Sequence, residues 1–103
     1  MILVTTDAIT GKELEMLGLV KGSTIQTVNA LRDIGAGLKN LVGGELTKYN
    51  DMMNNARALA TKRMVEEAQS LGADAIVGIR YSSASVMQSA AEVMAYGTAV
   101  KFR

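Results

Sequence analysis

The chain contains no cysteine and no histidine. The absence of cysteine excludes disulfides, thiol nucleophiles, iron–sulfur clusters and cysteine-bound zinc. The absence of histidine removes the commonest general base and the commonest transition-metal ligand. A chain without cysteine also fits a reducing compartment, so we expect a cytoplasmic protein. Few kinds of catalytic or metal site remain open to this sequence.

Proline and tryptophan are also absent, and there is 1 phenylalanine. With 10 glycines and no proline, the turns must depend on glycine. An apolar fraction of 49% with so few aromatic residues predicts an aliphatic core in which the 7 methionines take part. For a chain of 103 residues we expect one domain, whose modest core would gain from oligomerisation.

Neither sign of charge dominates the chain. The net charge is +1, with acidic and basic residues well mixed, so we expect no nucleic-acid partner. Residues 1–17 lack a basic region, and Asp7 interrupts the apolar run, which argues against a signal peptide. No apolar run approaches the roughly 18 residues of a membrane-spanning helix, so we expect no membrane span.

The clearest pattern in the chain is a long amphipathic helix over residues 45–71. Gly72 follows it and supplies the left-handed residue that ends a helix. Three alanines in its apolar stripe would let the helix lie close to a sheet. The stripe, at steps of three or four residues, consists of Leu46, Tyr49, Met53, Ala56, Ala60, Met64, Ala68 and Leu71, and it is widened by Met52, Leu59 and Val65.

A second, shorter helix is indicated over residues 32–42. Gly35 and Gly37 each weaken it by about 1 kcal/mol relative to Ala, so packing must compensate or the helix is irregular. Gly43 and Gly44 then break the chain direction. The helical face of this segment is formed by Leu31, Ile34, Leu38 and Leu41.

The part of the chain before these helices predicts strands. Residues 2–6 read as a short edge or interface strand, because they are β-branched or aliphatic. Residues 12–17 read as a helical turn or a continued loop. Residues 19–29 are a strand candidate, in which Gly22 indicates a bulge or a close backbone approach.

Two further strands are predicted after the long helix. The first covers residues 74–85, and we assign its alternate residues Ala75, Val77, Ile79 and Tyr81 to the core. Ile76, Gly78 and Arg80 then face the other way. Residues 84–90 are small and polar enough to form the hairpin loop.

The last strand is predicted over residues 91–102 and has two apolar faces. One face suits a helix lying above it, because it consists of the small residues Ala91, Val93, Ala95, Gly97 and Ala99. The opposite face is too apolar to be bare solvent surface; it consists of Glu92, Met94, Tyr96, Thr98, Val100 and Phe102. A neighbouring subunit is the simplest source of a layer over that face.

Three sequence blocks carry a resemblance to a known family: RDIGAGLKNLVGGE (32–45), RMVEEAQSLGADAIVGIRY (63–81) and AEVMAYGTAVK (91–101). In order and spacing they resemble the YbjQ family, an uncharacterised family whose label refers to heavy-metal binding. The resemblance covers nearly the whole chain. It implies an α+β fold, a β-α-β-β unit with an antiparallel three-stranded sheet and one long helix packed on it, similar to a dodecin subunit. It also implies a homopentameric ring, for which residues 2–6 are a candidate assembly strand, and it brings no established reaction.

Metal binding has to be argued without the usual ligands. Soft heavy metals prefer thiolate and imidazole, and this chain has neither. Carboxylates remain, and Asp33 and Glu45 flank the glycine-bearing helix, where a ring would repeat them around its axis. Helix capping and solvent-exposed charge explain these two carboxylates as well. We therefore predict no cofactor and keep the binding of a divalent cation as an alternative. Met52, Met53 and Met64 are better explained as core residues than as a copper(I) site.

Two other groups of residues suggest binding or contact. Gly43, Gly44 and Glu45 resemble an anion-binding helix start, although a glycine turn explains them equally. We predict that Arg80 and Glu92 lie opposite one another across the hairpin, as a cross-strand or an intersubunit ion pair. We favour the intersubunit pair, because Met94 and Tyr96 share the face of Glu92.

These patterns favour a non-enzymatic, oligomeric binding or scaffolding protein. The alternative is a metal-binding protein that uses carboxylates at subunit interfaces. A third class is an enzyme with a site between subunits; the serines lack a histidine partner, and nothing locates a Ser–Lys dyad. The candidate ligand-binding or interface residues are Arg32, Asp33, Gly43, Gly44, Glu45, Tyr49, Arg80, Glu92, Met94 and Tyr96, of which Arg32, Asp33, Glu45 and Tyr49 would form the enzyme site.

Overall fold

The structure of the protein is a computed structural model that describes residues 1–27, 43–87 and 90–103. For residues 27, 43–46, 48 and 86–87 only the backbone is described. The helix predicted over residues 32–42 therefore lies outside the described residues. The described elements are β1 (Ile2–Leu3), β2 (Leu14–Thr27), α2 (Gly43–Ser70), β3 (Ala75–Met87) and β4 (Ala90–Phe102).

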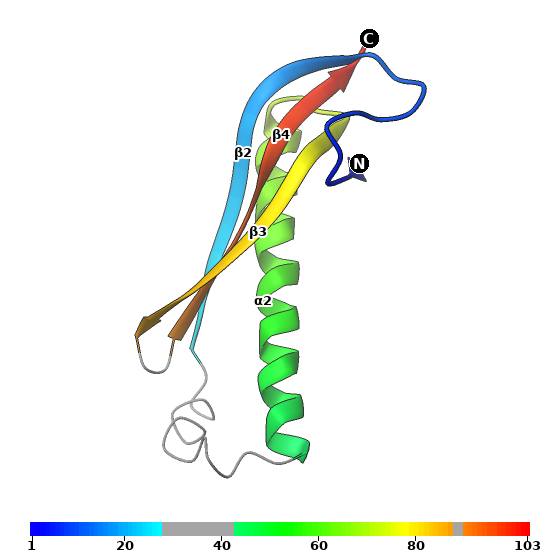
Figure 1. The fold of residues 1–103 in the computed structure, drawn as a ribbon. Coiled ribbons are helices and arrows are strands. Elements are labelled where there is room, and N and C mark those ends of the chain that lie inside the picture. The colour runs from blue at the N-terminus through cyan, green and yellow to red at the C-terminus, as the bar shows by residue number, and fades with distance from the viewer. Residues whose placement is uncertain (28–42, 88–89) are drawn as a thin grey trace.

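The strands form a four-stranded mixed sheet in the order β1-β3-β4-β2, with α2 lying along one face (Figure 1). The strands β2 and β3 each pair antiparallel with β4, as expected. The prediction of a three-stranded antiparallel sheet is wrong, because β1 adds a fourth strand parallel to β3. The amide of Val4 donates to the carbonyl of Ile76 at 3.0 Å and so continues this pairing. The predicted edge strand is confirmed at Ile2–Leu3, but it is shorter than the predicted residues 2–6.

The long helix is confirmed, although α2 begins and ends slightly earlier than the predicted residues 45–71. The middle of its predicted stripe is confirmed, since Ala56, Ala60, Met64 and Ala68 are fully buried. The prediction is wrong at the two ends that are described, because Tyr49 and Leu71 are exposed. Burial of a side chain as large as Met64 contributes about 1.5–3 kcal/mol. Gly72 has a φ of 77° and ends the helix as expected. The three alanines allow α2 to pack closely on β2 and β4.

The strand β2 begins earlier than the sequence predicts. Residues 12–17 were expected to be a helical turn or a loop, yet β2 already starts at Leu14. The sheet register shifts between Met16 and Gly18, so the bulge lies there and not at Gly22. Pairing with β4 overrides the local preference, because Leu14 lies opposite Phe102 and packs in an apolar cluster with it.

Two apolar clusters lie on opposite faces of the sheet. The cluster between the sheet and α2 consists of Val20, Ala56, Ala60, Met64, Ala68, Ile76, Ile79, Val93, Ala95 and Ala99. The predicted orientation of the last strand is confirmed, because its small residues belong to this cluster. The second cluster consists of Ala75, Val77 and Val100, packed against Val4, Ile9, Leu14 and Phe102. The N-terminal segment therefore covers one end of the face opposite α2.

A register shift between Val77 and Arg80 reverses the alternation of β3. Gly78, inside this shift, has a φ of 62°, which only glycine adopts readily. Before the shift Ile76 packs toward α2, and after it Ile79 does so. The prediction that Ala75, Val77, Ile79 and Tyr81 share one core face is therefore wrong.

The hairpin between β3 and β4 is tighter than predicted. Residues 84–90 were expected to form the loop, but β3 runs to Met87 and β4 starts at Ala90. Ser85 already pairs with Ala91. Because both strands extend this far, they project past the part of the sheet that α2 covers most closely, toward the start of that helix (Figure 1).

Candidate functional site

The face of the sheet turned away from α2 carries four of the candidate residues. Arg80 lies opposite Tyr96, and Ser82 lies opposite Met94. We call this surface the open face; it consists of Leu19, Lys21, Ser23 and Ile25 on β2, Arg80, Ser82 and Ala84 on β3, and Glu92, Met94, Tyr96 and Thr98 on β4. Strand alternation places these side chains on one side of the sheet.

The open face is apolar at several points. Leu19 is 66% exposed, Ile25 58% and Tyr96 37%, while Met94 beside them is half-buried. Lys21 and Arg80 flank Tyr96 on its two neighbouring strands. Since the N-terminal segment covers only the end near Val100, these apolar side chains have no second layer among the described residues.

Arg80 and Glu92 do share the open face, but they are not opposite one another. Glu92 pairs with Ala84, whereas Arg80 pairs with Tyr96, which is four residues further along β4. Four residues of strand correspond to about 13 Å. The predicted cross-strand pair is therefore wrong. Arg80 instead donates from Nη1 to the carbonyl oxygen of Thr5 at 3.0 Å, which ties the N-terminal segment to the sheet.

Two edges of the sheet lack a strand partner within the described part of the chain. The strand β2 is at one edge along its full length. At the other edge, β1 pairs with Ala75 and Ile76, and backbone hydrogen bonds from residues 4–6 continue to Ile79, so residues 80–84 of β3 have no further strand beside them. Unpaired edges offer backbone donors and acceptors to another chain. Arg63 on α2 engages one carbonyl of β2, that of Ser23, at 2.7 Å.

Of the other candidate residues, those that are described lie near the start of α2. Arg32 and Asp33 lie outside the described residues. Gly43, Gly44 and Glu45 form the first turn of α2, so the two glycines belong to the helix and do not form a turn before it. Tyr49 is described, and its side chain is 37% exposed. Glu45 lies one turn before Tyr49 on α2, but its side chain is not described, so the described residues do not test the predicted enzyme site.

Sequence reasoning missed a groove between α2 and β3. The helix lies mainly over β2 and β4, so no described residue outside the groove itself is seen to cover the helix-facing side of the later part of β3. Tyr81 on that side is 49% exposed. We call this feature the α2–β3 groove; it is lined by Tyr49, Met53 and Arg57 on α2, Tyr81, Ser82, Ser83, Ala84 and Ser85 on β3, and Ala90, Ala91 and Val93 on β4.

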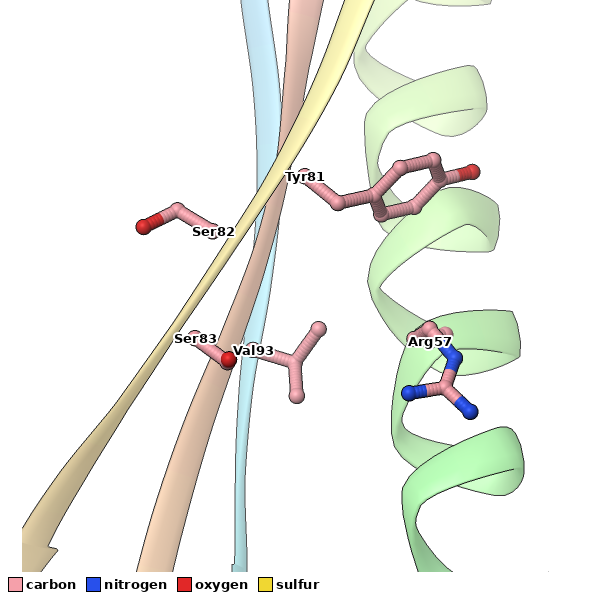
Figure 2. A pocket seen from close by; sticks show the side chains of 5 residues that line it. All are labelled: Arg57, Tyr81, Ser82, Ser83 and Val93. Carbon is pink, nitrogen blue, oxygen red and sulfur yellow. The ribbon is translucent and has the colours of Figure 1, made fainter.

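The groove contains two adjoining cavities. One of about 150 Å³ is lined by Arg57, Tyr81 and Ser83 above Val93. The other, of about 170 Å³, is lined by Tyr49 and Met53 with small residues of the two strands, and Ser83 lines both. Figure 2 shows Tyr81 reaching from β3 toward α2, whereas the side chain of Ser82 points to the other side of the strand.

Hydrogen bonds hold one wall of the groove in place. The hydroxyl oxygens of Thr61 and Tyr81 lie 2.8 Å apart and connect α2 to β3. Arg57 donates from Nη2 to Oδ1 of Asn54. Within the described residues, Arg57 forms no ion pair. The spacing of Tyr49, Met53, Arg57 and Thr61 along one helical row was visible in the sequence, but the turn of Tyr81 toward that row depends on the register shift at Gly78.

A metal centre finds no support in the described residues, which contain no group of three or more acidic side chains that could hold an ion. The two carboxylates of the metal hypothesis are not tested by this, because Asp33 and the side chain of Glu45 are not described. In the described segments, no helix is long and apolar enough to cross a membrane.

The fold and these surfaces define a small α+β protein in which one long helix lies on a four-stranded mixed sheet. The chain belongs to the YbjQ family, whose model, described as "Putative heavy-metal-binding", matches residues 1–103. The predicted family membership is thereby confirmed. The family is uncharacterised, and no catalytic activity is assigned to it.

Curated relatives agree with this placement, and a solved structure shares the fold. A UPF0145 protein of Alkaliphilus metalliredigens is 68% identical over 102 residues, which cover 99% of each chain. A UPF0145 protein of Clostridium novyi is 64% identical over 101 residues and 98% of each chain. The crystal structure of a protein of unknown function from Pediococcus pentosaceus, of the DUF74 family, has a TM-score of 0.73 at 19% identity, covering 100% of this chain and 98% of that one. That likeness shows the shared fold.

Proposed function

We propose that this protein assembles into a ring of five copies and acts in the cytoplasm as a binding or scaffolding protein, without catalysing a reaction. The observation that carries the assembly is the open face. Leu19, Ile25 and Tyr96 are large apolar side chains that remain exposed on it. Covering a side chain of this size contributes about 1.5–3 kcal/mol, so a neighbouring subunit would gain several such contributions.

The two sheet edges support the same proposal. A ring needs two different surfaces on each subunit, so that every copy contacts two neighbours. The long edge of β2 and the edge of β3 over residues 80–84 are such a pair of surfaces, since neither has a further strand beside it within the described residues. They lie at opposite sides of the sheet, as head-to-tail assembly requires. Residues 2–6 stand beside the second edge and would assist this contact.

The remaining parts of the proposal rest on composition. A chain without histidine or cysteine lacks the commonest nucleophile–base combinations, which favours binding over catalysis. The lack of cysteine fits the cytoplasm, and a net charge of +1 gives no reason for a nucleic-acid partner.

Size-exclusion chromatography with light scattering tests the assembly. We expect the mass of five chains at micromolar concentration. A monomer at that concentration would overturn the proposal of assembly. A closed assembly of another number would overturn the ring of five but leave the open face and the edges as contact surfaces.

Divalent-cation binding by Asp33 and Glu45, repeated around the ring, is the alternative that the sequence leaves open. Calorimetry of tag-free protein with Mn²⁺, Ni²⁺, Cu²⁺ and Zn²⁺ separates it from the main proposal. Saturable heat that disappears in the double variant Asp33→Asn, Glu45→Gln would establish the alternative. Equal heats for the variant and the original protein would dismiss it.

A further inference from the structure

We propose that the α2–β3 groove binds a small organic monocarboxylate with an apolar body of about aromatic-ring size. This inference goes beyond assembly, because α2, β3 and β4 of one chain already form both cavities. It assigns a ligand class to a surface on which Tyr49 is the one predicted site residue among those whose side chains are described.

The charge of the ligand follows from Arg57. Arg57 lines the first cavity, and among the described residues no carboxylate lines either cavity. A guanidinium carries five N–H donors, and the hydrogen bond to Asn54 uses only one of its nitrogen atoms. A single cation is matched by a single negative charge, and the planar fork of Arg fits a carboxylate in two parallel hydrogen bonds. A dianionic phosphate would leave one charge unmatched.

The hydrogen bonds of the hydroxyl groups determine which of them can donate, together with Arg57, to the bound anion. Thr61 donates its only hydroxyl proton to the carbonyl oxygen of Arg57, at 2.7 Å. The proton in the 2.8 Å contact between Thr61 and Tyr81 must therefore come from Tyr81. Tyr81 then has no proton to give to an anion and contributes the face of its ring instead. Ser83, which lines both cavities, is the hydroxyl placed to donate to the carboxylate.

The second cavity accounts for the apolar body. Met53 and the ring of Tyr49 line it from α2, and Ala90 and Ala91 line it from β4. At roughly 30 Å³ for each small group, each cavity holds about five non-hydrogen atoms. A ligand that spans both would have about ten such atoms, with the carboxylate at Arg57 and the ring toward Met53. Phenylacetate has this size and shape and serves as the probe.

The test is an NMR titration of the full chain with phenylacetate and, separately, with its neutral analogue phenylacetamide. For a ligand of this size we expect a dissociation constant of about 1 mM. The amide signals that shift should be those of residues beside Arg57 and Ser83. Phenylacetamide should bind at least about tenfold more weakly, because it lacks the charge that Arg57 matches.

Variants assign the effect to the groove. Arg57→Gln should weaken phenylacetate binding about tenfold, and Ser83→Ala about threefold, whereas Tyr81→Phe should change it less than Ser83→Ala does. Lys62→Gln removes the same charge from an exposed position of α2 that lines neither cavity, so binding should be unchanged. Equal affinity for acid and amide, equal affinity in Arg57→Gln, or shifts confined to another surface would each overturn the inference. Light scattering on the same samples measures the assembly separately. A failure of the binding inference can therefore be distinguished from a failure of the assembly proposal.

Discussion

The backbone of Gly22 on β2 lies directly against that of Ala60 on α2. A Cβ atom at Gly22 would come within 2.3 Å of the carbonyl oxygen of Ala60 and of the amide nitrogen of Met64. Both are backbone atoms, so no rotation of a side chain can relieve the clash. The sequence predicted either a bulge or a close approach at this glycine, and the close approach is confirmed.

Gly22→Ala should therefore destabilise the protein by about 1–3 kcal/mol, since the helix must move away from the sheet. Replacing glycine by alanine in an unstrained position would instead stabilise the fold by about 0.4–1 kcal/mol through the unfolded state. The sign of the change in unfolding free energy therefore shows whether Gly22 packs directly against the backbone of α2. Urea unfolding monitored by circular dichroism measures it, and Ser23→Ala is the control, with a change within about 0.5 kcal/mol. An unchanged or higher midpoint for Gly22→Ala would contradict the close packing of α2 on β2.

Asp74 fixes the end of β4 through a hydrogen bond to the backbone. The amide of Phe102 donates to Oδ2 of Asp74 at 2.8 Å, and the amide of Asp74 donates to Val100 at 2.8 Å. Asp74→Ala leaves the amide of Phe102 without this partner and should cost about 1–2 kcal/mol. Asp74→Asn keeps an oxygen acceptor and should cost less than half as much. Thermal unfolding of both variants checks the order; equal losses would show that charge, and not the hydrogen bond, is the stabilising feature.

Local periodicity was sufficient for the helix and the last strand. The spacing of Ala56, Ala60, Met64 and Ala68 is a property of the segment itself, and each of these residues is buried as predicted. The small residues of β4 likewise follow a period of two without interruption. Such patterns depend only on which face meets the core.

The errors arise where distant residues decide the structure. The reversal at Gly78 depends on an irregular register with β4, and nothing in the local alternation marks it. The parallel pairing of Ile2 with Ala75 joins residues far apart in the chain. The α2–β3 groove depends on both the reversal and the position of α2, so it was not visible in the sequence. Of the predicted site residues, Arg32 and Asp33 are not described, whereas Met94 and Tyr96 lie on the open face as expected.

The contact between Thr61 and Tyr81 is a direct connection from α2 to β3, which otherwise touch little. Tyr81→Phe and Thr61→Val should each destabilise the fold by about 0.5–1.5 kcal/mol. The double variant should cost less than the sum of the two, because the second change removes a partner that is already lost. Urea unfolding of the four proteins gives the coupling energy. Strictly additive losses would show that the two hydroxyls do not interact in solution.

The open face yields the sharpest prediction about assembly. Ile25→Glu places a carboxylate where a neighbouring subunit would cover an apolar side chain, and Tyr96→Glu does the same on β4. Burying such a charge without a partner is costly, so each variant should raise the dissociation constant of the assembly at least about a hundredfold. Light scattering should then show monomers at concentrations where the original protein is assembled.

The matched control is Leu71→Glu, because Leu71 is also a large exposed apolar residue, at 48%, but lies at the end of α2, away from the open face. It undergoes the same chemical change and should keep the full assembled mass. Circular dichroism of all three variants should match the original protein, since Ile25, Tyr96 and Leu71 are exposed within one chain. If Ile25→Glu and Tyr96→Glu both retain the assembled mass, the open face is not the contact surface. Assembly would then have to rest on the sheet edges, whose backbone groups these substitutions leave intact.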